Sequence, residues 1–432
     1  MYKFFREKAD APDYDCRENC ELKYYENVDA AEFSGWIDAL SKDGFDVLQK
    51  NEINSNLFFL LKNDNILLTA LFTPCDKTLR VTASSNVAVP MLEKCSYTGE
   101  CETKFYCFEN DHSIIDCGMC LLVQCSDYSF FVVDSGHYFQ FNDNDRIYKF
   151  MRERTPDGKK VVVSGWFVTH AHTDHISKLI DFLKYNCNDV IIEGFYSNLL
   201  PYEYEEPNWD IEEKLISKKL FDLMDRCGIP KYKLHTGERF YIRNLAFDVL
   251  GTHEDVYPQH IRDYNDSSCI VMMEADGTRV FIPGDAAVKA SELLEKRFDN
   301  SLKCDVVQVA HHGHIGLSSH AYELLNAKIA VFPITRIKFD EEYPRIEANR
   351  RLIELADGYY ISSDGTVEIS MKTQKVRQHD DETFEDFEKI RRQWGYTYTD
   401  ERKKELYEIY LEHGGNLDKE VLPAWYKGFS IY

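Results

Sequence analysis

Basic residues are too few to balance the acidic ones in this 432-residue chain, which has 51 Lys and Arg against 74 Asp and Glu and a formal charge of -23 at pH 7. Such an acidic protein repels the phosphate backbone of nucleic acids at long range. The composition therefore argues against tight nonspecific binding to duplexes, unless a local basic patch or bound metals reverse the field. A short or small phosphorylated substrate remains compatible with it.

Long apolar runs are also missing. No stretch approaches the roughly 20 residues of a membrane-spanning helix, and the first fifteen residues lack the apolar core of a signal peptide. We therefore expect no membrane segment and a cytoplasmic location. The chain is 44% hydrophobic and 14% aromatic, which is enough to build a packed core.

A second C-x-x-C motif is absent, although the chain has 13 cysteines. Cys117 and Cys120 form the one such pair. An odd number of thiols without an export signal favours reduced cysteines over a disulfide framework. We interpret the lone pair as two thiols that pack against neighbouring strands, with a zinc or redox site as the alternative.

The densest chemical signal lies between residues 169 and 178, which read T-H-A-H-T-D-H-I-S-K. The apolar run 161–168 before it is typical of a buried strand, and the apolar spacing from Ile176 to Leu183 is typical of an amphipathic helix. The turn between them predicts that His170 and His172 converge on one cation and that Asp174 and His175 face a second. Imidazole and carboxylate are ligands that zinc, manganese and iron accept.

Three further segments end apolar strands with polar side chains. Residues 130–133 lead into Asp134-Ser135-Gly136, residues 280–282 lead into Pro283-Gly284-Asp285, and residues 305–309 lead into Ala310-His311-His312-Gly313-His314. Together with the histidine motif, these segments resemble the metallo-β-lactamase superfamily, and in particular the soluble domain of competence DNA-uptake proteins of the ComEC type. The resemblance covers roughly residues 109 to 370.

The resemblance implies an α/β fold, an αββα sandwich. It also implies that Asp134 steadies the histidine loop through hydrogen bonds, that Asp285 bridges two metals, and that His311 or His312 completes the ligand set. The chain departs from the family pattern at Cys120 and Leu121, which stand for a Gly and an Asp, and at His314, which stands for a Ser.

The number of candidate ligands favours two metal ions over a single tetrahedral one. We expect two divalent cations, zinc before manganese or iron, and hydrolysis by a bridging hydroxide. The expected catalytic residues are Asp174, His312 and His314. The expected metal ligands are His170, His172, Asp174, His175, Asp285, His311 and His312.

Many superfamily members carry one more histidine on the loop before the Gly-Asp strand. This chain has Asn265-Asp266-Ser267-Ser268 there, as the competence-type proteins have Asn and Ser. His253 and His260 lie earlier and are interpreted as ordinary loop histidines that could substitute.

The resemblance favours phosphodiester hydrolysis, of a short nucleic acid or a small phosphorylated molecule. A lactone, thioester or lactam is the alternative substrate on the same site, because the fold alone does not choose the substrate. A non-catalytic binding protein that retains the fold and a redox di-iron protein are the remaining hypotheses.

Three units are expected along the chain: a small α+β domain over residues 1–108, the αββα domain over 109–372, and a helical C-terminal extension over 373–432. In the first unit we expect a helix opened by Asp29 and closed near Gly44, a hairpin of residues 57–61 and 66–72, and a strand over 79–83. The sequence also predicts a loop over 202–210, which is either a lid or substrate wall or a solvated surface excursion, a helix over 211–226 and a hairpin within 359–370. The first unit and the extension are the candidate surfaces for homo-oligomer formation.

Overall fold

The computed structural model describes residues 5–379 except 17–18, 86, 96–98, 110–117, 138–142, 201–210 and 262–263. The expected loop over 202–210, the expected helices after residue 380 and Cys117 lie outside the described residues. None of the helices in the described ranges is long and apolar enough to cross a bilayer.

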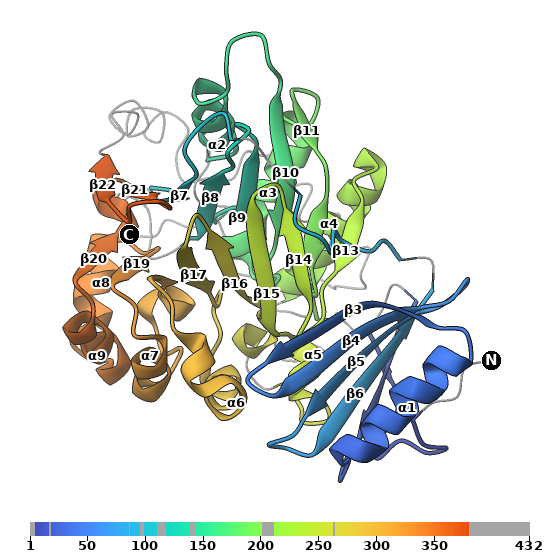
Figure 1. The fold of residues 1–432 in the computed structure, drawn as a ribbon. Helices are drawn as coiled ribbons and strands as arrows, with labels where there is room; N and C mark the ends of the chain where they lie inside the picture. Colours follow the sequence, from blue (N-terminus) through green and yellow to red (C-terminus); the bar gives the residue numbers. More distant parts are fainter. Residues whose placement is uncertain are drawn as a thin grey trace, which may run out of the picture.

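The N-terminal part forms a six-stranded sheet of its own in the order β1-β2-β6-β5-β4-β3, covered on one face by helix α1 (Figure 1). Its strands are β1 Tyr14–Asp15, β2 Cys20–Tyr25, β3 Asp46–Ile53, β4 Asn56–Lys62, β5 Leu67–Thr73 and β6 Thr78–Ser84. Asp29 caps α1 (Ala30–Lys42) by accepting a hydrogen bond from the Glu32 backbone N–H at 2.8 Å. The expected helix, the expected hairpin and the expected strand over 79–83 are present, whereas β1, β2 and β3 were not predicted.

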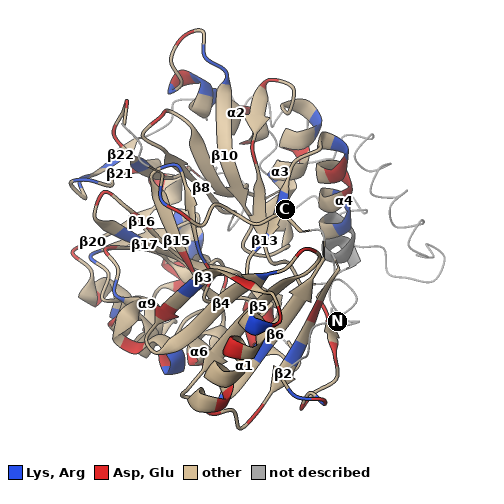
Figure 2. Cartoon of the chain, turned by 45° about the vertical axis from the view of Figure 1, so that its right-hand side comes forward, with Lys and Arg blue, Asp and Glu red and all other residues tan. Residues whose placement is uncertain are grey.

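A second sheet contains the segment before the histidine motif. Its order is β13-β12-β10-β9-β8-β7-β21-β22, and β11 also pairs with β10. The strands are β7 Lys104–Cys107, β8 Cys120–Gln124, β9 Phe130–Asp134, β10 Val161–Phe167, β11 Val190–Ile192, β12 Phe195–Ser197, β13 Lys231–Lys233, β21 Thr366–Ser370 and β22 Val376–His379. Strand β10 is rich in β-branched and aromatic residues that suit a strand buried on both faces, and it carries no charge along its length (Figure 2).

The third sheet faces the second and runs in the order β14-β15-β16-β17-β18-β19-β20. Its strands are β14 Arg239–Ile242, β15 Leu245–Gly251, β16 Ile270–Ala275, β17 Thr278–Ile282, β18 Val306–Gln308, β19 Ile329–Phe332 and β20 Gly358–Ile361. A continuous core lies between the two sheets, with Phe131 and Phe167 from one packed beside Phe247 and Val280 from the other.

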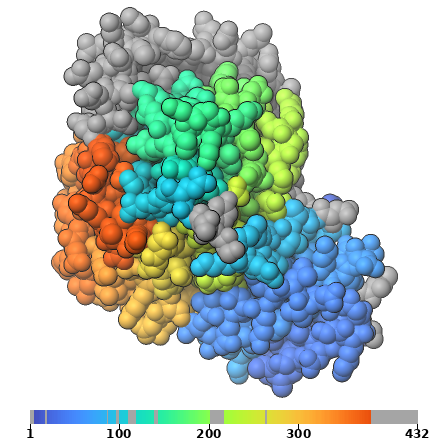
Figure 3. Space-filling view, turned by 45° about the horizontal axis from the view of Figure 1, so that its top comes forward, coloured from blue at the N-terminus to red at the C-terminus, as the bar shows by residue number. Residues whose placement is uncertain are grey.

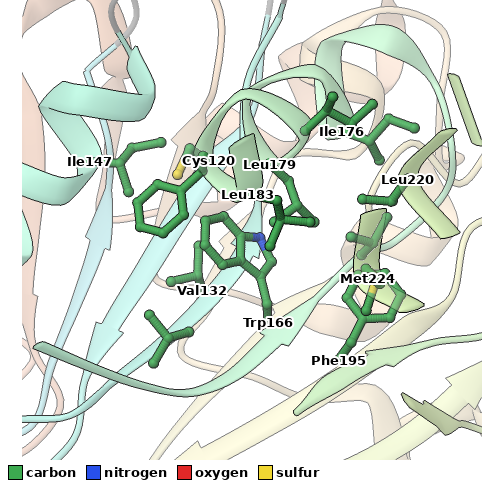
Figure 4. Close-up of a cluster of buried hydrophobic side chains, with 14 of the residues drawn as sticks. Cys120, Val132, Ile147, Trp166, Ile176, Leu179, Leu183, Phe195, Leu220 and Met224 are labelled. Atoms are coloured by element: carbon green, nitrogen blue, oxygen red, sulfur yellow. The ribbon is translucent and has the colours of Figure 1, made fainter. Parts of the chain in front are cut away.

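Helices cover the outer faces of both sheets. Trp166 of β10 packs with Leu179 and Leu183 in the core under α2 (Asp143–Glu153), α3 (Thr173–Tyr185) and α4 (Ile211–Cys227) (Figure 4). A separate core lies under α6 (Val288–Phe298), α7 (Ser319–Leu325), α8 (Arg336–Glu342) and α9 (Glu347–Leu355) on the third sheet. The layers are thus helix, sheet, sheet, helix, which confirms the expected αββα sandwich. Cys120 belongs to the core with Trp166, as a packing thiol would.

Two expectations near the end of the sandwich are wrong. Residues 359–370 do not form a hairpin, because β20 pairs with β19 in the third sheet whereas β21 pairs with β7 and β22 in the second. The turn Ser362–Asp364 therefore carries the chain from one sheet to the other. Strand β22 also lies in the segment expected to be helical, since its antiparallel pairing with β21 supplies backbone partners that a sequence pattern does not reveal.

The N-terminal sheet lies as a lobe against the sandwich (Figure 3). Buried Arg80 of β6 donates hydrogen bonds to the backbone carbonyls of Glu254, Asp255 and Tyr257 at 3.0, 2.9 and 2.8 Å. These carbonyls belong to helix α5 (His253–Val256) and the residue after it. The lobe is thereby fastened to the connection between β15 and β16, and the proposed division at residue 108 stays a prediction.

Candidate metal centre

The expected ligands lie at the carboxyl ends of parallel strands in both sheets of the sandwich. Strands β9 and β10 are parallel in the second sheet, and β17 and β18 are parallel in the third. Asp134 ends β9, the histidine motif follows β10, Asp285 follows β17 and His312 follows β18. Because the carboxyl ends of parallel strands meet at one edge of a sheet, the two sheets bring these side chains together.

Four of them form one compact group: Asp174, His175, Asp285 and His312. The His312 Nε2 atom lies 3.0 Å from Asp174 Oδ2 and 3.4 Å from Asp285 Oδ2. The His175 Nε2 atom lies 3.2 Å from Asp285 Oδ2, 3.2 Å from His312 Nε2 and 3.7 Å from Asp174 Oδ2.

These separations fit a tetrahedral cation. A metal bound to nitrogen and oxygen at about 2.0 to 2.1 Å places neighbouring ligands about 3.3 to 3.4 Å apart. The five distances between donor atoms of this group scatter around that value, from 3.0 to 3.7 Å. The side chains thus surround a space of the size that a zinc-like ion needs.

His170 and His172 form a second group together with Asp285. His170 Nε2 lies 2.9 Å from His172 Nδ1 and 3.9 Å from Asp285 Oδ2. The Oδ1 atom of Asp285 is buried and has no hydrogen-bond partner. A carboxylate shared by both groups, with one oxygen atom unpaired, is what a bridging ligand between two cations requires.

Asp134 holds the ring of His175 in the orientation that such a site needs. Its Oδ1 accepts a hydrogen bond from the Thr169 backbone N–H at 2.8 Å, and its Oδ2 accepts from the Thr169 hydroxyl at 2.8 Å. The same Oδ2 lies 2.7 Å from His175 Nδ1. Because Nδ1 donates to the carboxylate, Nε2 is left as the ligand atom. The steadying role expected for Asp134 agrees with these contacts, and Thr169 is a partner that the sequence did not single out.

The ring of His312 is oriented by the backbone. Its Nδ1 lies 2.7 Å from the Pro333 carbonyl after β19, so Nε2 again faces the donor group. His311 and His312 have positive φ angles of 51° and 54°. Non-glycine residues in this region are strained by about 1 to 2 kcal/mol each, and such strain is commonly found at functional sites.

Burial and mutual attraction set the charges of the donors. Burial lowers the pKa of His170 well below its usual value and that of His172 to about 4, so both rings are neutral. Burial alone would raise the pKa of Asp285, but His175 and His312 hold it well below the usual range. Burial would lower the pKa of His312, yet Asp285 and Asp174 raise it to about 10. Protons on His175 and His312 therefore balance the carboxylates when no cation does.

Four histidines of the sequence analysis stand outside both donor groups in the described part of the chain. His311 pairs with the Ile315 carbonyl through Nδ1 at 2.8 Å and lies 3.3 Å from the Asn265 side chain through Nε2. His314 faces Glu342 at 3.8 Å. His253 is bonded to Asn198 and Tyr14, and neither it nor His260 joins the donors. Among these residues the roles of His311 and His314 stay predictions.

The donor set as a whole fits two divalent cations. Nitrogen and oxygen atoms of borderline ligands, one shared carboxylate and an unpaired buried oxygen atom match the requirements of zinc, manganese or iron. Asp174, His175, Asp285 and His312 would hold one ion, and His170, His172 and Asp285 would hold the other.

Comparisons with known proteins give structural likeness only. The chain matches no family model and no curated protein sequence. Solved structures similar to it include the metallo-beta-lactamase fold protein YhfI from Bacillus subtilis, with a TM-score of 0.36, 10% identity and coverage of 60% of this chain and 96% of that one. Unliganded yeast PDE1 is similar with a TM-score of 0.38 and 12% identity, over 60% of this chain and 96% of that one. Human tRNase Z, short form, is similar with a TM-score of 0.33 and 11% identity, over 55% of this chain and 94% of that one. The assignment of the site therefore depends on the chain's own geometry.

Proposed function

We propose that this protein is a dinuclear metal-dependent hydrolase that cleaves a phosphodiester in a short nucleic acid or a small phosphorylated molecule. The observation that carries the proposal is the convergence of six donor side chains in two groups that share Asp285. Two bound cations would supply a water of lowered pKa and would stabilise negative charge on the substrate.

The charge of the site favours an anionic substrate. The two carboxylates that face the donor space, Asp174 and Asp285, offset only half of the charge of two divalent cations. The neutral rings of His170 and His172 add no negative charge. A phosphodiester anion gains more from this excess positive charge than a neutral lactam or lactone does.

His311 is the best placed residue for giving a proton to the leaving group. It lies outside the donor groups, yet it is next to His312 in sequence and contacts Asn265. The ring of Tyr264, the residue before Asn265, lies tilted against His172 with ring centroids 4.8 Å apart. His311 therefore borders the donor space, and because its Nδ1 donates to the Ile315 carbonyl, Nε2 is the ring nitrogen left to exchange a proton with the leaving group.

The test is a substrate panel on the full chain reconstituted with zinc or manganese. We expect hydrolysis of bis-p-nitrophenyl phosphate and no comparable activity on a chromogenic lactam, a lactone or a thioester. Asp285→Asn should bind neither metal firmly and should lose activity by at least about a thousandfold. Turnover of the lactam alone would refute the phosphodiester assignment, and two bound metals without any turnover would favour a binding protein.

Two histidine variants locate the proton donor. His311→Ala should keep both metals and slow turnover by about a hundredfold or more on substrates with poor leaving groups. The effect should shrink for p-nitrophenolate, which leaves without a proton. His314→Ala serves as the matched control, and a larger effect there would assign the role to His314 instead.

A further inference from the structure

A second cluster of ligand-type side chains lies outside the metal centre. Cys16, Cys20 and Glu254 each offer one ligand atom, and the three atoms lie within 4.8 Å of one another. The Cys16 N–H donates to the Cys20 carbonyl at 2.9 Å, so the two cysteines are held together by their backbones. Glu254 comes from α5 of the sandwich. All three residues are buried, with exposures of 0%, 2% and 5%.

One of the two oxygen atoms of the Glu254 carboxylate has no hydrogen-bond partner. Its Oε2 atom is bonded to His235 Nδ1 at 2.9 Å, whereas its Oε1 atom is buried without any hydrogen bond. An unsatisfied buried carboxylate oxygen is costly, since it has lost its water and gained nothing in return. A cation beside the two cysteines would satisfy it.

We propose that Cys16, Cys20 and Glu254 form a separate zinc site that fastens the N-terminal lobe to the sandwich. Two thiolates and a carboxylate oxygen are established zinc ligands, and the thiolates disfavour magnesium, calcium and manganese. The hydrogen bond from His235 to the other carboxylate oxygen is the type of contact that orients a ligating carboxylate.

The local charges agree with a divalent ion. Two thiolates and one carboxylate carry three negative charges, of which a zinc ion offsets two. Lys233 lies beside the cluster, since its ammonium group donates a hydrogen bond to the Cys16 carbonyl. The positive charge of this lysine, like that of a protonated His235 bonded to Glu254, opposes the remaining negative charge of the buried cluster.

A cavity of about 250 Å³ borders the cluster. Its lining includes Cys16, Lys233, Asn198 and Phe221. Three protein ligands leave one position of a tetrahedral zinc for water, and this cavity is large enough to supply one. The proposed site is thus a fastening point with an accessible fourth position.

The proposed zinc site lies where the N-terminal lobe contacts the sandwich. Cys16 directly follows β1 and Cys20 begins β2 of the lobe, whereas Glu254 lies on the connection to which Arg80 also donates hydrogen bonds. An ion bound by residues from both parts exists only when they are docked, so its binding free energy stabilises the docked state.

Cobalt substitution of the full chain tests the proposal. A cobalt ion bound by thiolate gives a charge-transfer absorption in the near ultraviolet, and the donors of the main centre, being nitrogen and oxygen, give none. We expect this band in the reduced wild-type protein and in Asp285→Asn. Cys20→Ser should lose the band and one equivalent of metal, whereas Cys304→Ser, which alters a buried cysteine of another core, should keep both.

A second measurement uses the wild-type chain, so its result does not depend on whether a variant folds. A mercurial thiol reagent in the presence of a chromogenic chelator should release one equivalent of zinc from the protein purified with metal. No band in the reduced protein, a band that survives in Cys20→Ser, or no zinc released with the thiols would each overturn the proposal. A Cys16–Cys20 disulfide in protein purified without oxidant would overturn it as well.

Discussion

The substitution Asp134→Asn changes the contact that orients the metal ligand His175 and leaves His175 itself unchanged. The new side chain has the size of the old one, and its remaining oxygen atom can still accept from the Thr169 N–H. The amide group that replaces Oδ2 is a donor, and it meets His175 Nδ1 at the 2.7 Å contact. His175 must then carry its proton on Nε2, which is the atom that faces Asp285 and His312.

The expected size of the effect follows from the reversed contact with His175, since the Thr169 hydroxyl, the other partner of Oδ2, can rotate and accept from the amide. A hydrogen bond to a charged group contributes about 1.5 to 3 kcal/mol, and loss of such a partner weakens metal binding about 10- to 100-fold. We therefore expect the ion held by His175 to bind one to two orders of magnitude more weakly. Burial raises the pKa of Asp134, so removal of its charge relieves a desolvation cost that partly offsets the lost contacts in the metal-free fold.

The assay is competition with a chromogenic chelator, together with thermal unfolding of the metal-free protein. Asp127→Asn is the matched control, because Asp127 also accepts from one residue's N–H and hydroxyl, those of Ser129, before β9 begins. That variant should bind both ions as the wild type does. If Asp134→Asn did so too, His175 would not depend on Asp134 for its tautomer, and the ligand assignment would fail.

Two further predictions concern the packing of Gly284 beside the metal centre and the contact of Arg80 with the sandwich. Gly284 has φ +58°, and an added Cβ would lie 2.7 Å from the Cβ atom of Thr169. Gly284→Ala should therefore lower the free energy of unfolding, measured in urea, by at least about 2 kcal/mol more than Gly277→Ala does. Gly277 has φ +85° with nothing nearby, and equal costs would contradict the clash. Arg80→Met should destabilise the chain by about 3 kcal/mol or more, because three carbonyls lose their donor. The exposed Arg6→Met should cost under about 1 kcal/mol, and a similar loss for both would show that the lobe is not held through Arg80.

The strands that end in site residues, and the helix after the histidine motif, were predictable because their apolar patterns are strong and their ends carry chemistry. The run 161–168 and the helix after it needed only periodicity, and both are present as β10 and α3. The pairing of strands was not predictable in the same way. Strands β20 and β21 are close in sequence and have turn residues between them, yet each finds its partners in a different sheet.

The sequence also could not distinguish His311 from His312. Two adjacent histidines have the same chemistry, and the choice depends on backbone angles and on the Pro333 carbonyl, which any residue type would supply. The cluster of Cys16, Cys20 and Glu254 was missed for a related reason. The C-x-x-x-C spacing is a weak signal by itself, and the third member is contributed by a distant helix that no local pattern connects to it.

The contacts that position the donors do not depend on a bound ion. Asp134 fixes His175, the Pro333 carbonyl fixes His312, and Gln308 bonds both the N–H and the carbonyl of Gly284 at 3.0 Å, directly before Asp285. These partners come from backbone and buried side chains, which are held by the two sheets. Cations would therefore enter a framework that is already arranged, and their affinity would be reduced by little reorganisation. What they must displace is the protons that balance the carboxylates.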